Sequence, residues 1–175
     1  MSDIIGIDLG TTSSAVAVYR NGRPTVITTS EGERVLSLVT FTRNGEASIG
    51  NRASRQAAIN PADSVYSVKR LLGRQFDDPV VKLVQSQHPF VTLQRAGDGG
   101  VEIVTAGSDR AYSAEEVFSW ILRHLKREAE TYLGTPVRRA VLAVPAHFND
   151  NQRYAAREAG RMAGLEILRV INEPA

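Results

Sequence analysis

The sequence predicts an α/β fold in which helices flank a mixed β-sheet and a smaller α/β subdomain is inserted into the chain. Two observations predict it. The first third of the chain consists of short β-rich runs separated by turn signals, and the last third alternates helix, strand, helix and strand. We therefore expect residues 1–35 and 112–175 to form the main sheet with its helices, and residues 36–111 to form the inserted subdomain.

Glycine-containing turns separate the expected strands. Asn21-Gly22 and Asn44-Gly45 each lie between β-rich runs, a pattern typical of a tight hairpin because both central residues adopt positive φ. A further hairpin is expected at Gly97-Asp98-Gly99-Gly100. The expected strands cover residues 3–9, 14–19, 24–29, 35–42, 46–50, 90–95, 101–105, 137–144 and 167–171.

The strongest helix signal covers residues 114–133. Ser113 and Glu116 form a capping-box pattern at its start, and apolar residues then recur on one face. Gly134 and Pro136 follow its end, where they stop a helix. The other expected helices cover residues 51–59, 64–72, 79–85 and 149–163.

The composition is that of an ordinary globular protein. Hydrophobic residues make up 42% and charged residues 23% of the chain, and the net charge of +2 argues against nucleic acid as the main partner. The absence of cysteine excludes disulfides and thiolate metal sites. No apolar run approaches the roughly 20 residues that span a bilayer, and the N-terminus lacks a signal-peptide pattern. We therefore expect no membrane partner and a cytoplasmic location.

A turn of small residues follows a carboxylate at the end of the first expected strand. Gly10 lets the backbone approach a polyanion, and successive N–H groups in such a turn form an anion-binding nest. Thr11, Thr12 and Ser13 add hydroxyl donors, and Asp8 can hold a hard divalent cation through its waters. The turn predicts a metal–phosphate site, although a plain hairpin with a surface aspartate has the same pattern. It is not a P-loop, because no Gly-Lys-Ser/Thr occurs.

The Asp8–Ser14 pattern resembles the first phosphate loop of the actin-like ATPase superfamily, which includes actin, sugar kinases and heat-shock chaperones. Residues 60–74 resemble the Asn-Pro…Lys-Arg-Leu-Ile-Gly-Arg segment of DnaK-type chaperones, and residues 143–153 resemble their Val-Pro-Ala-Tyr-Phe-Asn-Asp-x-Gln-Arg. Residues 159–165 and 171–174 are similar to the helix, turn and Ile-Asn-Glu-Pro that follow. The chain is thus identified as a member of the 70-kDa heat-shock family. The resemblance implies lobe I of its actin-like, ribonuclease-H-like ATPase domain.

The resemblance implies a role for each residue that matches a family motif. Asp8 would anchor hydrated Mg²⁺, and Thr11 and Thr12 would contact the phosphates of ATP or ADP. Lys69 would orient the attacking water and stabilise charge on the γ-phosphate, and Glu173 would accept a hydrogen bond from water near the metal. These roles agree with phosphoryl transfer, which needs positioning and cations more than covalent help from the protein.

The resemblance also implies communication with partners. Pro145 and Arg153 would form a relay that reports the nucleotide state to a substrate-binding domain. Unfolded client peptides, a J-domain co-chaperone and a nucleotide-exchange factor would be the partners of the parent protein.

Other interpretations are open at this stage. A sugar kinase has the same phosphate loop but would need a sugar site with a catalytic aspartate, and an actin- or MreB-like filament subunit would use nucleotide as an assembly switch. Without the resemblance, Lys69 would be part of a solvated face, Glu173 a strand end and Pro145 a strand-terminating proline.

Several features depart from the family pattern or from a complete domain. His147 stands where Tyr or Phe is usual, Ala175 replaces the usual Thr, and Val35-Leu36-Ser37-Leu38 lacks the family's proline. The chain stops just after an expected strand, and it contains no Asp-Leu-Gly-Gly-Gly, the family's second phosphate loop. We therefore expect a fragment that binds ATP weakly and hydrolyses it at a negligible rate, since cleft closure would be incomplete.

Overall fold

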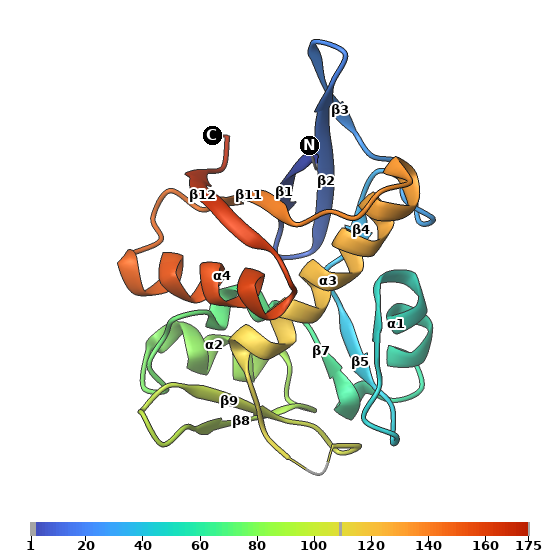
Figure 1. The fold of residues 1–175 in the computed structure, drawn as a ribbon. Coiled ribbons are helices and arrows are strands. Elements are labelled where there is room, and N and C mark those ends of the chain that lie inside the picture. Colours follow the sequence, from blue (N-terminus) through green and yellow to red (C-terminus); the bar gives the residue numbers. More distant parts are fainter. Residues whose placement is uncertain (1–2, 109, 175) are drawn as a thin grey trace.

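The computed structural model describes residues 3–108 and 110–174 and is built around one mixed sheet (Figure 1). The strands of this sheet are β1 (Ile4–Leu9), β2 (Ser13–Arg20), β3 (Arg23–Val26), β4 (Val35–Leu36), β11 (Arg139–Val144) and β12 (Glu166–Asn172). They lie in the order β12-β11-β1-β2-β3, and β4 pairs with β2. β11 is parallel to both β1 and β12, whereas β1, β2 and β3 form an antiparallel meander. The predicted mixed sheet is confirmed.

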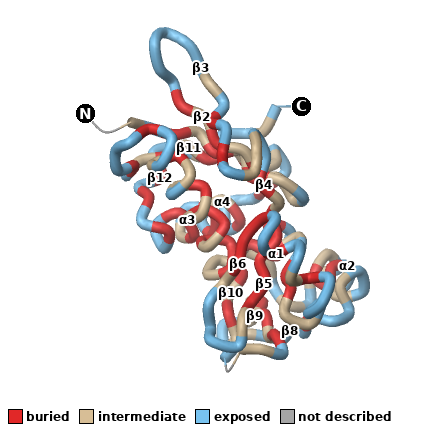
Figure 2. The backbone as a smooth tube through the Cα atoms, turned by 90° about the vertical axis from the view of Figure 1, so that its right-hand side faces the viewer, coloured by how far each residue is buried: buried red, intermediate tan, exposed pale blue. Residues whose placement is uncertain are grey.

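The β2–β3 hairpin has the predicted tight turn. Asn21 and Gly22 both have positive φ, at 54° and 77°, which matches the right-handed twist of the flanking strands. The hairpin projects from the sheet, and Figure 2 shows much of its tip exposed.

Two long helices pack against the main sheet. α3 (Ala114–Leu133) and α4 (Asp150–Met162) each begin with a reciprocal capping box, with Ser113 and Asn149 as the N-cap residues. Gly134, at φ 71°, ends α3 in the left-handed conformation that favours glycine. Among the helices of the described residues, none has the length and apolarity needed to cross a membrane.

The middle of the chain forms two small sheets with short helices. Its elements are β5 (Val39–Phe41), β6 (Ala47–Ile49), α1 (Gly50–Ala57), the 3₁₀ turn η1 (Pro61–Asp63), β7 (Ser64–Val65), the 3₁₀ turn η2 (Val68–Leu71), α2 (Pro79–Gln87), β8 (Thr92–Arg95), β9 (Val101–Val104) and β10 (Tyr112–Ser113). One sheet has the order β6-β5-β7 and the other β10-β9-β8. The expected hairpin at residues 97–100 joins β8 to β9.

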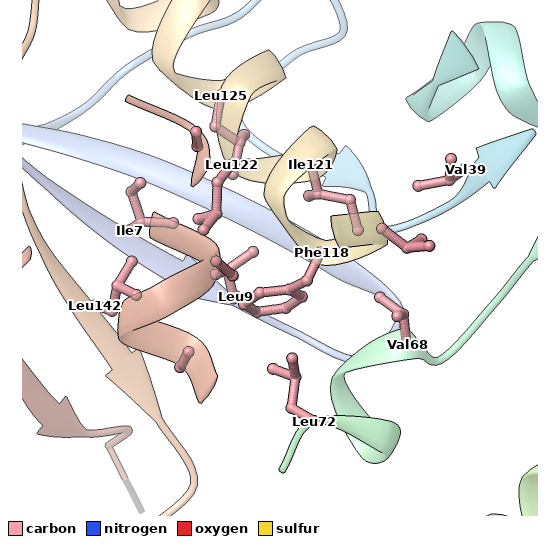
Figure 3. Close-up of a cluster of buried hydrophobic side chains, with 14 of the residues drawn as sticks. Ile7, Leu9, Val39, Val68, Leu72, Phe118, Ile121, Leu122, Leu125 and Leu142 are labelled. Carbon is pink, nitrogen blue, oxygen red and sulfur yellow. The ribbon is translucent and has the colours of Figure 1, made fainter. Parts of the chain in front are cut away.

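α3 is the element that connects the main sheet to the middle of the chain. The core cluster in Figure 3 gathers Leu9 of β1, Phe118 of α3 and Val68 and Leu72 from the η2 region. Phe118 is only 2% exposed. A single hydrophobic cluster therefore runs through both parts of the chain, and η2 is packed through α3 onto the main sheet.

The expected strand over residues 35–42 is two strands. β4 pairs with β2 in the main sheet, whereas β5 pairs with β6 and β7 in a small sheet. The chain crosses between the sheets at Ser37, whose N–H donates to the carbonyl of Thr12 at 2.8 Å. A continuous β-rich pattern cannot reveal such a change of partner.

The prediction of a helix over residues 64–72 is wrong. Ser64 and Val65 form β7 beside β5, and Val68–Leu71 form a single 3₁₀ turn. Ser67 adopts φ 57°, a left-handed conformation that interrupts any helix at this point. Pairing with β5 therefore overrides the local helical pattern. The other expected helices and strands are confirmed, with small shifts at their ends.

We predict that Phe118→Ala lowers the free energy of unfolding by about 3 to 5 kcal/mol, because it leaves a cavity between α3, β1 and η2. Urea denaturation monitored by circular dichroism measures the change. Phe90→Ala is the matched control, since Phe90 is 66% exposed and its loss should cost less than about 0.5 kcal/mol. Equal losses in the two variants would contradict this account of the core.

Candidate functional site

The turn between β1 and β2 is closed tightly around a glycine. A Cβ atom at Gly10 would lie 2.1 Å from the carbonyl oxygen of Ser13, so no other residue fits without moving the backbone. Ser37 stabilises the turn with two hydrogen bonds. Its hydroxyl donates to the Gly10 carbonyl at 2.9 Å, and its N–H donates to the Thr12 carbonyl. The turn is therefore fixed before any ligand binds.

Asp8 lies beside this turn, near the carboxyl end of β1. Its Cα partners are Ala15 in β2 and Ala143 in β11, so it lies within the sheet rather than at its edge. Its side chain is nevertheless 44% exposed. The carboxylate thus opens to solvent at the end of a strand, the usual place for ligands in α/β sheets.

Lys69 reaches the same region from η2. The residue is only 5% exposed, and its ammonium donates to the carboxylate of Glu173. Ser67 precedes η2 in a left-handed conformation that costs a non-glycine residue about 1 to 2 kcal/mol. Such strain is concentrated at functional sites, and here it stands two residues before Lys69.

Glu173 follows the end of β12. Its N–H donates to the carbonyl of Val144 at 2.7 Å, so the parallel pairing of β11 and β12 extends to this residue. The side chains of Lys69 and Glu173 are 6% and 27% exposed, and the two residues are 104 apart in sequence. The ion pair therefore forms at the boundary between core and solvent.

One open cleft collects most of the expected site residues. It is lined by Asp8, Gly10, Thr11, Arg34, Lys69, Pro145, Ala146, His147, Glu173 and Pro174. The expected residues Thr12, Ser13 and Arg153 do not line it. The cleft thus holds a glycine turn, a lysine and two carboxylates, although these come from widely separated segments.

A chain of hydrogen bonds connects Pro145, which lines the cleft, to Arg153, which does not. The carbonyl of Pro145 accepts from the N–H of Phe148 at 3.0 Å, which closes the turn after β11. Arg153, on α4, donates from Nε to the Phe148 carbonyl at 3.1 Å and from Nη2 to Asn172 Oδ1 at 2.6 Å. Arg153 therefore links this turn to the residue before Glu173.

Comparison with known proteins identifies the family. The family model described as Hsp70 protein matches residues 4–175. The chain belongs to the Hsp70 family. It is 46% identical over 175 residues to proteins named chaperone protein dnaK from Cyanidioschyzon merolae and from Cyanophora paradoxa. These alignments cover 99% of this chain and 28% of each relative, so this Hsp70 chain spans little more than a quarter of their length.

Family membership confirms the resemblance and the fold class that the sequence predicts. The mixed α/β architecture is that of an actin-like, ribonuclease-H-like lobe, and the sugar-kinase and filament alternatives are set aside. His147, which departs from the usual aromatic residue, lines the cleft and packs edge-on against Phe148 at 5.9 Å between ring centroids. Ala175, the other single-residue departure, lies outside the described residues.

Arg34 is the cleft residue that sequence reasoning missed. It lies in the Glu31-Gly32-Glu33-Arg34 turn before β4, and its guanidinium contacts Ser13 and Asp8. A single arginine in a loop belongs to no periodic pattern, so the sequence does not indicate that it is a site residue. Its one local signal is the glycine-containing turn of residues 31–34 just before β4, which places Arg34 next to a strand of the main sheet.

We predict that Glu173→Gln lowers the free energy of unfolding by about 2 kcal/mol, because it leaves a nearly buried ammonium without a charged partner. Changing Lys69 to Met in the same variant should recover part of the loss, since Met has a similar length and needs no partner. Urea denaturation measures both.

The matched control is Glu158→Gln. Glu158 pairs at 3.0 Å with Arg161, whose side chain is 70% exposed, and the loss of such a pair costs about 0.5 kcal/mol or less. If Glu173→Gln proves as mild as this control, the Lys69 ammonium is hydrated in solution rather than held by Glu173.

Proposed function

We propose that this chain is lobe I of the ATP-binding domain of a DnaK-type chaperone that assists protein folding, and that the parent protein converts ATP and water to ADP and phosphate. The observation that carries the proposal is the convergence of the Gly10 turn, Asp8, Lys69 and Glu173 on one cleft. The match to Hsp70 relatives along the whole chain supports it.

The Gly10 turn fits a phosphate group. Glycine at position 10 permits this tight turn, and successive backbone N–H groups in such a turn can form an anion-binding nest. Thr11 adds a hydroxyl donor that lines the cleft. We assign Gly10, Thr11, Thr12 and Ser13 to the binding of the ATP or ADP phosphates.

Asp8 fits hydrated Mg²⁺. Among residues 3–108 and 110–174, no group of three or more His, Cys, Asp or Glu side chains could hold a metal ion. A single exposed carboxylate suits Mg²⁺, which keeps several waters and is otherwise bound by substrate phosphates. Asp8 would hold the hydrated ion through its waters, and the bound ion would neutralise part of the phosphate charge.

Lys69 and Glu173 fit the chemistry of phosphoryl transfer to water. The ammonium of Lys69 is held at a fixed place in the cleft, where it can stabilise negative charge on the transferred phosphoryl group. Glu173 can accept a hydrogen bond from the attacking water and so orient it. The protein thus supplies position and electrostatic stabilisation, which are the main needs of this reaction.

Pro145 and Arg153 are proposed as the relay between nucleotide and substrate domain. Their connection ends at Asn172, next to Glu173, so a change at the cleft can reach α4 through hydrogen bonds. We further propose unfolded client peptides, a J-domain co-chaperone and a nucleotide-exchange factor as partners of the parent protein. Its proposed location is the cytoplasm.

We propose that residues 1–35 and 112–175 form one subdomain and residues 36–111 the inserted one. The separation of β1–β4, β11 and β12 from the two small sheets supports this division. Pairing crosses both boundaries, because Leu36 of β4 pairs with Ser13 of β2 and residues 112–113 pair with β9.

Two measurements test the function. We expect Mg–ATP to bind this chain weakly and to shift the amide NMR signals of Gly10, Thr11 and Thr12. Hydrolysis should be negligible, since the chain contains no second phosphate loop. In a longer protein that contains this chain, Lys69→Ala should lower single-turnover hydrolysis by at least about a hundredfold while nucleotide affinity changes little.

Lys126→Ala is the control for lost charge, because Lys126 pairs with Glu130 at 2.9 Å on α3 and does not line the cleft. Unchanged turnover in Lys69→Ala would remove Lys69 from the proposed mechanism. Amide shifts away from the Gly10 turn would place the nucleotide elsewhere.

A further inference from the structure

The Glu31-Gly32-Glu33-Arg34 turn places a second cation in the cleft. Arg34 Nε donates to the Ser13 hydroxyl at 2.8 Å, and Nη2 donates to the Ser13 carbonyl at 2.9 Å. Nη1 and Nη2 lie 3.5 and 3.4 Å from Asp8 Oδ2. The guanidinium therefore contacts both the Gly10 turn and the carboxylate of Asp8 beside it. Arg34 also lines the cleft, together with Lys69.

The backbone that carries Arg34 is held at several points. Thr29 and Gly32 exchange backbone hydrogen bonds of 2.9 and 3.1 Å, which close the turn. The N–H and hydroxyl of Ser30 both donate to Glu128 of α3 at 2.8 Å. Glu31 accepts from the N–H of Asn51, in the first turn of α1, at 2.7 Å. Arg34 thus extends from a turn that is tied to both α1 and α3.

The contacts of Arg34 differ in strength. The two bonds to Ser13 have good lengths, whereas the contacts to Asp8 are long and lie between side chains that are 51% and 44% exposed. An exposed ion pair of this kind contributes little to stability. Phosphate oxygens are stronger partners for a guanidinium, which presents several N–H donors in one plane.

We propose that Arg34 is a phosphate-binding residue of the cleft that exchanges Asp8 for a phosphate oxygen while keeping its bonds to Ser13. In the free protein its charge occupies the place beside Asp8 that a divalent cation would take. When a metal–polyphosphate enters, the guanidinium turns its remaining donors to the anion, which releases Asp8 to hold the hydrated metal. This inference rests on the proposed function, since it requires that the cleft binds phosphate.

The exchange predicts opposite effects of one substitution on two ligands. Arg34→Gln removes the cation that competes at Asp8, so bare Mn²⁺, used as a paramagnetic substitute for Mg²⁺, should bind about fivefold more tightly. The same variant lacks the donors for phosphate, so Mn²⁺–pyrophosphate should bind about tenfold more weakly. Broadening of the Gly10 and Thr11 amide signals measures both affinities on the full 175-residue chain.

A merely structural role gives a different result. If Arg34 only stiffens the turn, Arg34→Gln lowers the affinity for both bare Mn²⁺ and Mn²⁺–pyrophosphate, and the proposal is wrong. Unchanged affinities for both ligands would also contradict it. Arg161→Gln removes the same charge from a pair outside the cleft and should change neither affinity.

If the Arg34→Gln variant does not fold, the same two affinities are measured on Arg34→Lys. It keeps the charge beside Asp8 but not the planar set of donors, so bare Mn²⁺ affinity should stay the same while Mn²⁺–pyrophosphate affinity falls. Wild-type affinity for both ligands in Arg34→Lys would overturn the proposal. If the wild-type chain itself shows no broadening at Gly10 with Mn²⁺–pyrophosphate, the proposed phosphate site fails first, and Arg34 with it.

Discussion

The ion pair between Lys69 and Glu173 is the contact on which the cleft depends. It joins residues 104 apart in sequence and closes at the point where η2 meets the end of β12. An ammonium so nearly buried needs a charged partner, because a buried charge without one is strongly destabilising. The pairing of β11 with β12 supplies that partner, and the position of Lys69 is thus determined by a strand far away in the chain.

Packing on α3 makes this pairing possible. Phe118 fills the space between Leu9 in the main sheet and Val68 and Leu72 around η2. Because protein interiors are close-packed, a shift of α3 would move η2 and Lys69 relative to the Gly10 turn. The strained backbone at Ser67 persists because this packing determines the course of the chain around it.

The cleft contains two cation–carboxylate pairs that differ in environment. Lys69 and Glu173 are largely shielded from solvent, whereas Arg34 and Asp8 are about half exposed. In the free protein each carboxylate therefore balances a cation, and the cleft does not accumulate charge of one sign. In the proposed exchange, a metal and a polyanion would replace the contact between Asp8 and Arg34, whereas Lys69 and Glu173 would stay paired.

Local sequence patterns predict the elements whose signals lie within a few residues. The capping box of Ser113, the positive-φ hairpin at Asn21-Gly22 and the glycine at the phosphate turn all appear as expected. These features depend on backbone geometry and nearby hydrogen bonds, which the residues themselves specify. The family motifs likewise indicate Asp8, Lys69 and Glu173 from the sequence alone, while their chemical roles are still proposals.

Tertiary structure decides what local patterns leave open. Residues 35–42 are divided between two sheets at Ser37, which binds the Gly10 turn, and residues 64–72 follow β5 rather than their helical pattern. Arg34 enters the site only because its turn is tied to α1 and α3. The sequence alone thus determined the types of most elements and the motifs of the cleft. Only the folded chain decided which strand, helix and charge each segment meets, because such partners are selected by packing between distant segments.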